Sequence, residues 1–160
     1  MLPWILEMMI DDEVLAKAFW TMAMTIRPGA RNSMNGTPAT VRTVLLIEDD
    51  PLLRSAVRSW MIKMGFEVLE ADNSDTAIEM FEAHRQTIDV VMQDLVLPGE
   101  LNGVELLQEL LSRRADLPVI IASGAIDADG ADQLYAMGAK AYLSKPYKME
   151  QLMALLDAME

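Results

Sequence analysis

The stretch DVVMQDLVLPG (residues 89–99) places a carboxylate at the end of an apolar run. Residues 90–92 are aliphatic or Met and predict a buried strand, and the Pro98–Gly99 pair predicts a loop. Asp94 stands between the two. Because an ionised carboxylate beside a packed core is costly unless it is paired, we expect Asp94 to have a cationic or hydrogen-bonding partner.

Outward from this stretch, strand-like and helix-like segments alternate along the chain. Apolar or alternating runs predict five strands, at residues 43–48, 66–71, 88–93, 117–123 and 140–144. Helices are predicted to begin at the Asp50–Pro51 and Asn73–Ser74 pairs and to cover residues 103–114, 127–138 and 149–159. Five strand–helix units in a row predict an α/β fold, a (βα)5 doubly wound parallel sheet with helices on both faces.

Polar residues follow or end four of these strands. With the flavodoxin-like strand order 2-1-3-4-5, strands one, three, four and five are neighbours, and ligands bind at their carboxyl ends. The groups at these ends are Glu48, Asp49, Asp94, Ser123 and Lys145. Carboxylates from two strands suit Mg²⁺, and a lysine with a hydroxyl completes an electrostatic clamp for a phosphoryl group. Asp94 would then be the nucleophile.

Composition excludes several other kinds of site. The chain has 160 residues, 52% of them apolar, so one domain with a good core is expected. It has no cysteine and a single histidine, His84, which excludes thiolate and multi-histidine metal sites. A net charge of −12 argues against direct binding to nucleic acid or to an anionic membrane. Neither a signal peptide nor a spanning segment is evident, so we expect the protein in the cytoplasm.

Four motifs carry a resemblance to a known family. VLLIEDDPLLR (44–54), VVMQDLVLPG (90–99), PVIIASGA (118–125) and AYLSKPY (141–147) resemble the successive signatures of a CheY-like response-regulator receiver domain, the phosphoacceptor of two-component signal transduction. The resemblance covers residues 41–160. It implies that a histidine kinase phosphorylates Asp94 and that Mg²⁺ is the cofactor.

The resemblance also implies roles for individual residues. The implied metal ligands are Glu48, Asp49, Asp94 and the backbone carbonyl of Val96. The implied phosphoryl-binding and switch residues are Ser123, Gly124, Lys145 and Tyr142. The peptide bond between Lys145 and Pro146 is expected to be cis.

The sequence departs from the family's pattern beside the phosphoacceptor. The loop after Asp94 has one more residue between Pro98 and Gly103 than the commonest receiver pattern. Val96 and Ala125 are apolar at two positions that commonly flank the attacking water. We therefore expect slow spontaneous loss of the phosphoryl group.

The function predicted is that of a single-domain response regulator, not an enzyme acting on external substrates. Its output would be a protein contact on the face formed by residues 127–138, 140–144 and 149–159, and a homodimer stays open. The alternative is an intermediate that passes the phosphoryl group to a histidine phosphotransfer protein. An aspartate-nucleophile phosphohydrolase is disfavoured, because Val96 replaces the second aspartate of such enzymes. A scaffold without phosphorylation is disfavoured by the complete set of site residues.

The first 40 residues lie outside the resemblance. Residues 1–26 have a large apolar helical face and predict an N-terminal helical extension that docks on a partner, on a second copy or on residues 43–160. Residues 27–42 are rich in Gly, Pro, Ser, Thr and Asn, which is typical of a linker. Alternatively, translation begins at Met34 and the upstream residues are a mis-assigned start. Both interpretations stay open.

Overall fold

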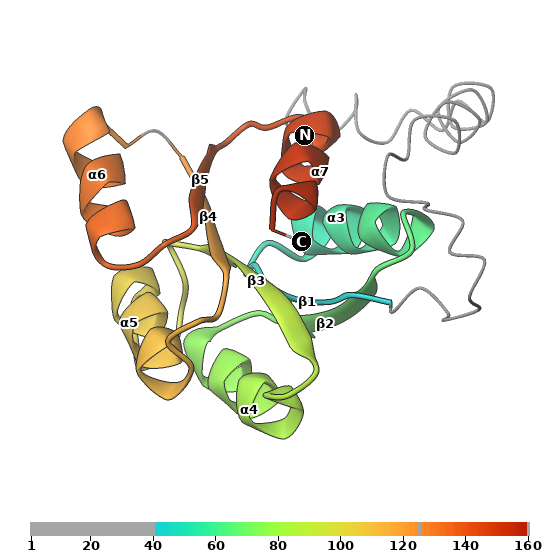
Figure 1. The fold of residues 1–160 in the computed structure, drawn as a ribbon, viewed down its shortest axis with the longest axis horizontal. Coiled ribbons are helices and arrows are strands. Elements are labelled where there is room, and N and C mark those ends of the chain that lie inside the picture. The colour runs from blue at the N-terminus through green and yellow to red at the C-terminus, as the bar shows by residue number, and fades with distance from the viewer. Residues whose placement is uncertain (1–40, 125, 160) are drawn as a thin grey trace, which may run out of the picture. The chain divides into compact units, whose positions relative to one another are not determined.

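The computed structural model describes residues 41–124 and 126–159, which form a five-stranded parallel sheet flanked by helices (Figure 1). The strand order is β2-β1-β3-β4-β5, as predicted. The strands are β1 (Thr43–Ile47), β2 (Glu67–Ala71), β3 (Ile88–Asp94), β4 (Val119–Ser123) and β5 (Ala141–Ser144). The helices are α3 (Pro51–Lys63), α4 (Ser74–His84), α5 (Gly103–Arg113), α6 (Ala128–Ala136) and α7 (Met149–Asp157). The predicted helical extension at residues 1–26 and most of the predicted linker lie outside the described residues.

Side chains at the predicted helix starts fix where four of the helices begin. The Asp50 carboxylate accepts hydrogen bonds from the backbone N–H groups of Leu52 and Leu53, shortly after the interior strand β1. Pro51 takes the first helical position, where no N–H is needed. The corresponding caps are Asn73 for α4, Asn102 for α5 and Asp127 for α6. Each cap holds a helix start close to the carboxyl end of the preceding strand, where the predicted site lies.

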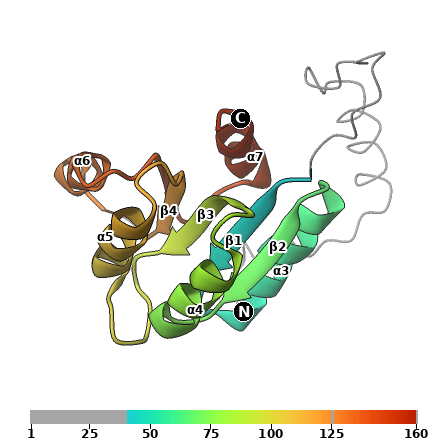
Figure 2. The ribbon, with the colours of Figure 1, turned by 60° about the horizontal axis from the view of Figure 1, so that its bottom comes forward.

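Helices cover the sheet on both faces. Figures 1 and 2 show α3 and α7 together on one face and α4, α5 and α6 on the other. The interior strands β1 and β4 are buried at every position, which explains their largely apolar sequences. On the three-helix face, the core includes Phe81 of α4, Leu107 of α5 and Leu134 of α6. Burial on both faces makes the sheet a rigid frame for the groups at its strand ends.

Each strand differs from the prediction at one end, by one or two residues, and two of these differences have a clear backbone reason. β4 begins at Val119 instead of residue 117, because Pro118 has no N–H to contribute to the ladder. β3 ends at Asp94 instead of residue 93, because Asp94 is in register with Ala122 of β4. Asp94 is therefore the last residue of the strand, and the sheet itself sets its position.

Candidate functional site

The sheet register brings the predicted site residues together. Ile47 pairs with Gln93, so Glu48 at the end of β1 lies beside Asp94 at the end of β3. Ser123 pairs with Ser144, so Lys145 follows β5 at the same edge. The carboxyl ends of four neighbouring strands thus meet, as the strand order predicted.

Lys145 is the partner of Asp94. Its ammonium Nζ lies 2.6 Å from Oδ2 of Asp94 and 2.7 Å from Oε2 of Glu48. Only 8% of Asp94 and 5% of Glu48 is exposed to solvent. Two buried carboxylates this close would repel each other. The single ammonium between them binds both and compensates one of the two negative charges.

The pKa values of Glu48 and Lys145 reflect both their burial and their contacts with each other and with Asp94. Burial raises the pKa of Glu48; the hydrogen bond and charge of Lys145 oppose this effect, and the charge of Asp94 adds to it. Burial lowers the pKa of Lys145, but the hydrogen bonds and charges of Asp94 and Glu48 outweigh burial and leave that pKa raised. Lys145 is therefore a permanent cation at neutral pH, as phosphoryl binding would require.

Three carboxylates form a cluster that fits a divalent cation. One oxygen each from Glu48, Asp49 and Asp94 lie within 4.8 Å of one another. Glu48 and Asp94 are buried, whereas Asp49 is exposed and leaves the cluster open to solvent. Such hard oxygen donors are those that Mg²⁺ prefers. The backbone N–H of Val96 donates to Oδ1 of Asp94 (3.0 Å), while the metal role of its carbonyl stays a prediction.

The remaining predicted residues lie at or beside the same edge of the sheet. Ser123 is 5% exposed, and its backbone carbonyl accepts a hydrogen bond from the N–H of Lys145 at 2.7 Å. The hydroxyl of Tyr142 donates to the carbonyl of Gly124 at 2.7 Å, which links β5 to the loop after β4. A Cβ atom at Gly124 would meet nothing within 4 Å, so there is open space beside this residue. The peptide bond between Lys145 and Pro146 is cis; Ala125 lies outside the described residues.

The long loop after Asp94 is fastened to the start of α4. The backbone N–H of Ser74 donates to the carbonyl of Pro98 (3.0 Å), and its Oγ accepts from the N–H of Leu101 (3.0 Å). Gly99 has a φ of +120°, and a Cβ there would lie 2.1 Å from Oγ of Ser74. Only glycine fits this close approach. Sequence analysis identified the glycine as a loop residue but gave no signal for its contact with Ser74.

A second attachment holds the other end of this loop. Gln93 is fully buried, and its Nε2 donates to the carbonyl of Gly103, the first residue of α5, at 2.7 Å. The N–H of Gly103 in turn donates to the carbonyl of Leu95 at 3.1 Å. The backbone on both sides of Asp94 is therefore tied to α5. Sequence analysis missed Gln93, because a polar residue within an apolar run does not reveal its partner.

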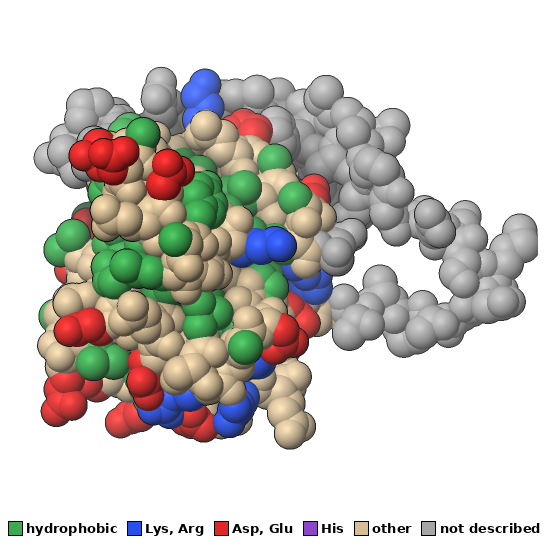
Figure 3. Space-filling model, turned by 60° about the vertical axis from the view of Figure 1, so that its left-hand side comes forward, with side chains coloured by type: hydrophobic (Ala, Val, Ile, Leu, Met, Phe, Trp, Pro, Cys, Tyr) green, Lys and Arg blue, Asp and Glu red, His purple; other side chains and the backbone are tan. Residues whose placement is uncertain are grey.

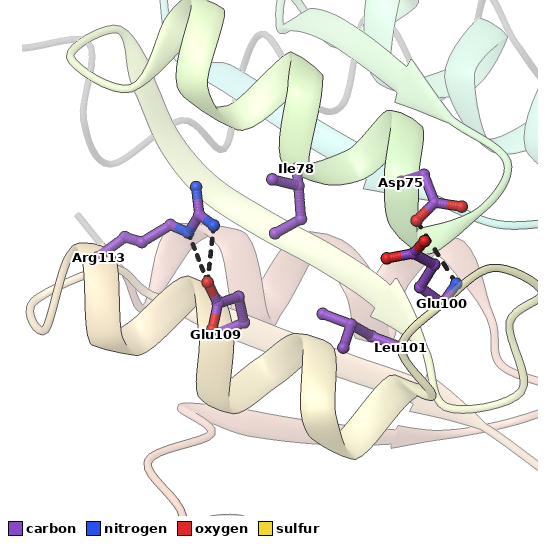
Figure 4. A pocket seen from close by; sticks show the side chains of 6 residues that line it. All are labelled: Asp75, Ile78, Glu100, Leu101, Glu109 and Arg113. Atoms are coloured by element: carbon purple, nitrogen blue, oxygen red, sulfur yellow. Dashed lines mark hydrogen bonds and ion pairs between the residues drawn. The ribbon is translucent and has the colours of Figure 1, made fainter.

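A hollow of about 410 Å³ lies between α4 and α5 and is separate from the acidic cluster (Figure 4). Ile78 and Leu101 lie between the Glu109–Arg113 ion pair at one end and Asp75 and Glu100 at the other. None of the predicted site residues lines it. The hollow borders the loop after Asp94 but contains none of the carboxylates of the acidic cluster.

Comparison with known proteins identifies the family. The sequence profile described as "Response regulator receiver domain" matches residues 44–157. The chain belongs to this family. A receiver domain protein from Clostridium thermocellum has a TM-score of 0.70 and 28% identity, over 74% of this chain and 94% of that one. A chemotaxis protein CheY4 of Vibrio cholerae, 22% identical with a TM-score of 0.68 over 76% of this chain and all of that one, shares the fold.

Two curated relatives are longer than the region that matches this chain. A C4-dicarboxylate transport transcriptional regulatory protein, DctD, of Pseudomonas aeruginosa is 39% identical over 72% of this chain and 24% of its own length. A cyclic di-GMP phosphodiesterase of Thermotoga maritima is 30% identical over 69% of this chain and 28% of its own length. The chain spans about a quarter of these two relatives, so the similarity concerns the receiver domain of a two-component response regulator. Within the described residues, no helix has the length and apolar character needed to cross a bilayer.

Tyr147, two residues beyond Lys145, provides a test of the packing next to the site residues. Its hydroxyl is buried and has no hydrogen-bond partner among the described residues. Burial, and then the charges of Glu48 and Asp94, raise the pKa of Tyr147 above its ordinary value of 10.0. An unpaired buried hydroxyl destabilises the folded state. We predict that Tyr147→Phe raises the free energy of unfolding at pH 7 by about 1 kcal/mol, measured by urea denaturation.

The same substitution should alter the response to alkaline pH. Above pH 10 the unfolded chain releases the tyrosine proton and the folded chain keeps it, so this group lowers the parent's stability by about 1.4 kcal/mol per pH unit. Tyr147→Phe removes that loss. Tyr142→Phe is the matched control and should instead lower stability by about 1 kcal/mol, because its hydroxyl is hydrogen-bonded. Equal destabilisation by both variants would contradict the unpaired state of the Tyr147 hydroxyl.

Proposed function

We propose that this receiver domain accepts a phosphoryl group on Asp94 from a phosphohistidine of a sensor kinase or a phosphotransfer protein. The observation that carries the proposal is the ammonium of Lys145, which is held by Asp94 and Glu48, two of the three carboxylates in the acidic cluster. A buried nucleophile, a cation and a divalent-ion site at one point are the parts that phosphoryl transfer needs.

The proposed step is a displacement at phosphorus. A carboxylate oxygen of Asp94 attacks, a new O–P bond forms, and the P–N bond of the phosphohistidine breaks. The leaving imidazole nitrogen keeps the electron pair and then takes a proton from solvent. Mg²⁺ held by Glu48, Asp49 and Asp94 would neutralise charge on the phosphoryl oxygens. Lys145 adds a point charge, and the hydroxyl of Ser123 is available as a donor.

The proposed output is a change of a protein-binding face. A phosphoryl group adds about −1.5 to −2 charges next to Ser123 and Lys145. Tyr142 connects this point to the face formed by α6, β5 and α7 through its bond to Gly124. On the side where α6 lies, Figure 3 shows apolar side chains exposed among acidic ones. Tyr135 and Met137, at the end of α6, are 48% and 37% exposed, which suits a protein contact.

A second candidate function is an intermediate in a phosphorelay. The open space beside Gly124 supports it, because a side chain of a histidine phosphotransfer protein could approach the phosphoryl group there. A phosphohydrolase for external substrates has less support, since Val96 offers no acid or base beside Asp94. The net charge of −12 supports protein partners over direct contact with nucleic acid.

Asp94 is predicted to be the only phosphoacceptor. Incubation with acetyl phosphate and Mg²⁺ should add one phosphoryl group, detected by intact-protein mass spectrometry. Asp94→Asn should abolish the addition, because an amide is not a nucleophile here. Asp89→Asn is the matched control and should be labelled like the parent, since Asp89 lies at the opposite end of β3. Labelling of Asp94→Asn would contradict the assignment.

Asp49 is predicted to control metal binding. Binding of Mg²⁺ to the folded state alone raises the free energy of unfolding, by about 2.7 kcal/mol at a concentration 100 times Kd. Asp49→Asn removes one of three carboxylates and should abolish most of the Mg²⁺-dependent rise in Tm. Asp116→Asn, a substitution of an exposed aspartate before β4, should leave that rise unchanged. An undiminished rise in Asp49→Asn would exclude the acidic cluster as the metal site.

Val96 is predicted to lengthen the life of the phosphorylated state. Hydrolysis needs a water in line with the O–P bond, and a 74% exposed valine gives that water no hydrogen-bond partner. Val96→Asn should shorten the half-life, by about tenfold for each 1.4 kcal/mol of added transition-state stabilisation. Val96→Ala removes bulk without adding a polar group and should have less effect. If the parent loses its phosphoryl group within seconds unaided, Val96 does not set the rate.

A further inference from the structure

Arg54, in the first turn of α3, contacts the backbone of the acidic pair. Its Nη1 donates to the carbonyl of Glu48 at 2.7 Å and lies 3.5 Å from the carbonyl of Asp49. Its Nε lies 3.5 Å from Oε1 of Glu70 on β2, and 19% of its side chain is exposed. One guanidinium therefore connects the turn after β1 with the neighbouring strand.

The hydrogen bond from Arg54 lies at the point where the backbone hydrogen bonds between β1 and β2 end. The N–H of Glu48 still pairs with the carbonyl of Ala71 on β2 at 3.0 Å. The carbonyl of Glu48 accepts from Arg54 instead. The position of the backbone limits where a carboxylate can reach. This hydrogen bond therefore restrains the point from which the Glu48 and Asp49 side chains extend.

We propose that Arg54 is a positioning residue of the metal site. It holds the backbone of Glu48 and Asp49 so that their carboxylates stay at the separation needed for Mg²⁺. This inference rests on the proposed function, since it assumes that Mg²⁺ binds at the acidic cluster. Arg54 itself does not contact the metal or the phosphoryl group.

The direction in which Mg²⁺ affinity changes distinguishes a positioning role of Arg54 from a purely electrostatic one. Arg54 is a cation close to a cation site, so its charge alone opposes Mg²⁺ binding. If charge were its only influence, replacing Arg54 with a neutral residue would tighten Mg²⁺ binding. A positioning role predicts the opposite result, because the carboxylates would lose their alignment.

Arg58, one turn further along α3, offers a matched control. Its Nε lies 2.8 Å from Oε2 of Glu70, the carboxylate that also faces Arg54. No contact between Arg58 and the acidic pair is found among the described residues. Arg58→Met therefore removes the same charge and a contact to the same glutamate, but leaves the backbone of Glu48 and Asp49 untouched.

The test measures Mg²⁺ binding to the full chain by isothermal titration calorimetry. Arg54→Met should bind about tenfold more weakly than the parent. Arg58→Met should bind as tightly as the parent or more tightly. In phosphorylation by acetyl phosphate, Arg54→Met should need about tenfold more Mg²⁺ for half the maximum rate, with a rate at saturating Mg²⁺ close to that of the parent.

Each other outcome is decisive. Unchanged or tighter binding by Arg54→Met, or equal weakening by Arg58→Met, would overturn the positioning role. If circular dichroism shows that Arg54→Met does not fold, Arg54→Lys is tested instead, because lysine keeps the positive charge but lacks the guanidinium group. Weaker Mg²⁺ binding by Arg54→Lys supports the proposal, and binding as tight as that of the parent overturns it. A parent chain that does not bind Mg²⁺ would overturn the proposed metal site together with this inference.

Discussion

A single ammonium between two buried carboxylates is the interaction on which the rest of this site depends. Glu48 and Asp94 lie at the ends of adjacent strands and are almost inaccessible to water. Without Lys145 they would be uncompensated like charges in a poorly solvated place, where removing one partner of a buried pair costs about 3–5 kcal/mol. The strand order places Lys145 at the carboxyl edge of the sheet, because β5 lies beside β4. The Nζ atom of Lys145 thus depends on the strand order for its position and pairs with both carboxylates of the site.

The sequence was sufficient to predict the sheet and the residues at its strand ends. Continuous apolar runs mark strands buried on both faces, and parallel connection leaves few topologies, so the convergence of Glu48, Asp94 and Lys145 followed from order alone. The cap at Asp50 was predictable for a similar reason, because capping is local. The roles of these residues in binding metal and phosphoryl groups are still predictions.

The sequence could not predict contacts that depend on the path of a loop or the reach of a long side chain. Arg54 looks like an ordinary exposed helix residue, because nothing in a helical pattern shows which carbonyl a guanidinium will meet. The contact between Ser74 and the loop after Asp94 joins residues more than 20 positions apart. The register at the start of β4 was missed because Pro118 belongs to an apolar run but lacks an N–H.

The attachment of the loop after Asp94 gives the domain a property that its fold class does not require. The loop that leaves Asp94 is bound to Ser74 by two hydrogen bonds and to α5 through Gln93. Its backbone therefore cannot shift at Val96 without straining the first turns of two helices on the same face of the sheet. These hydrogen bonds couple the surroundings of Asp94 to the start of α4.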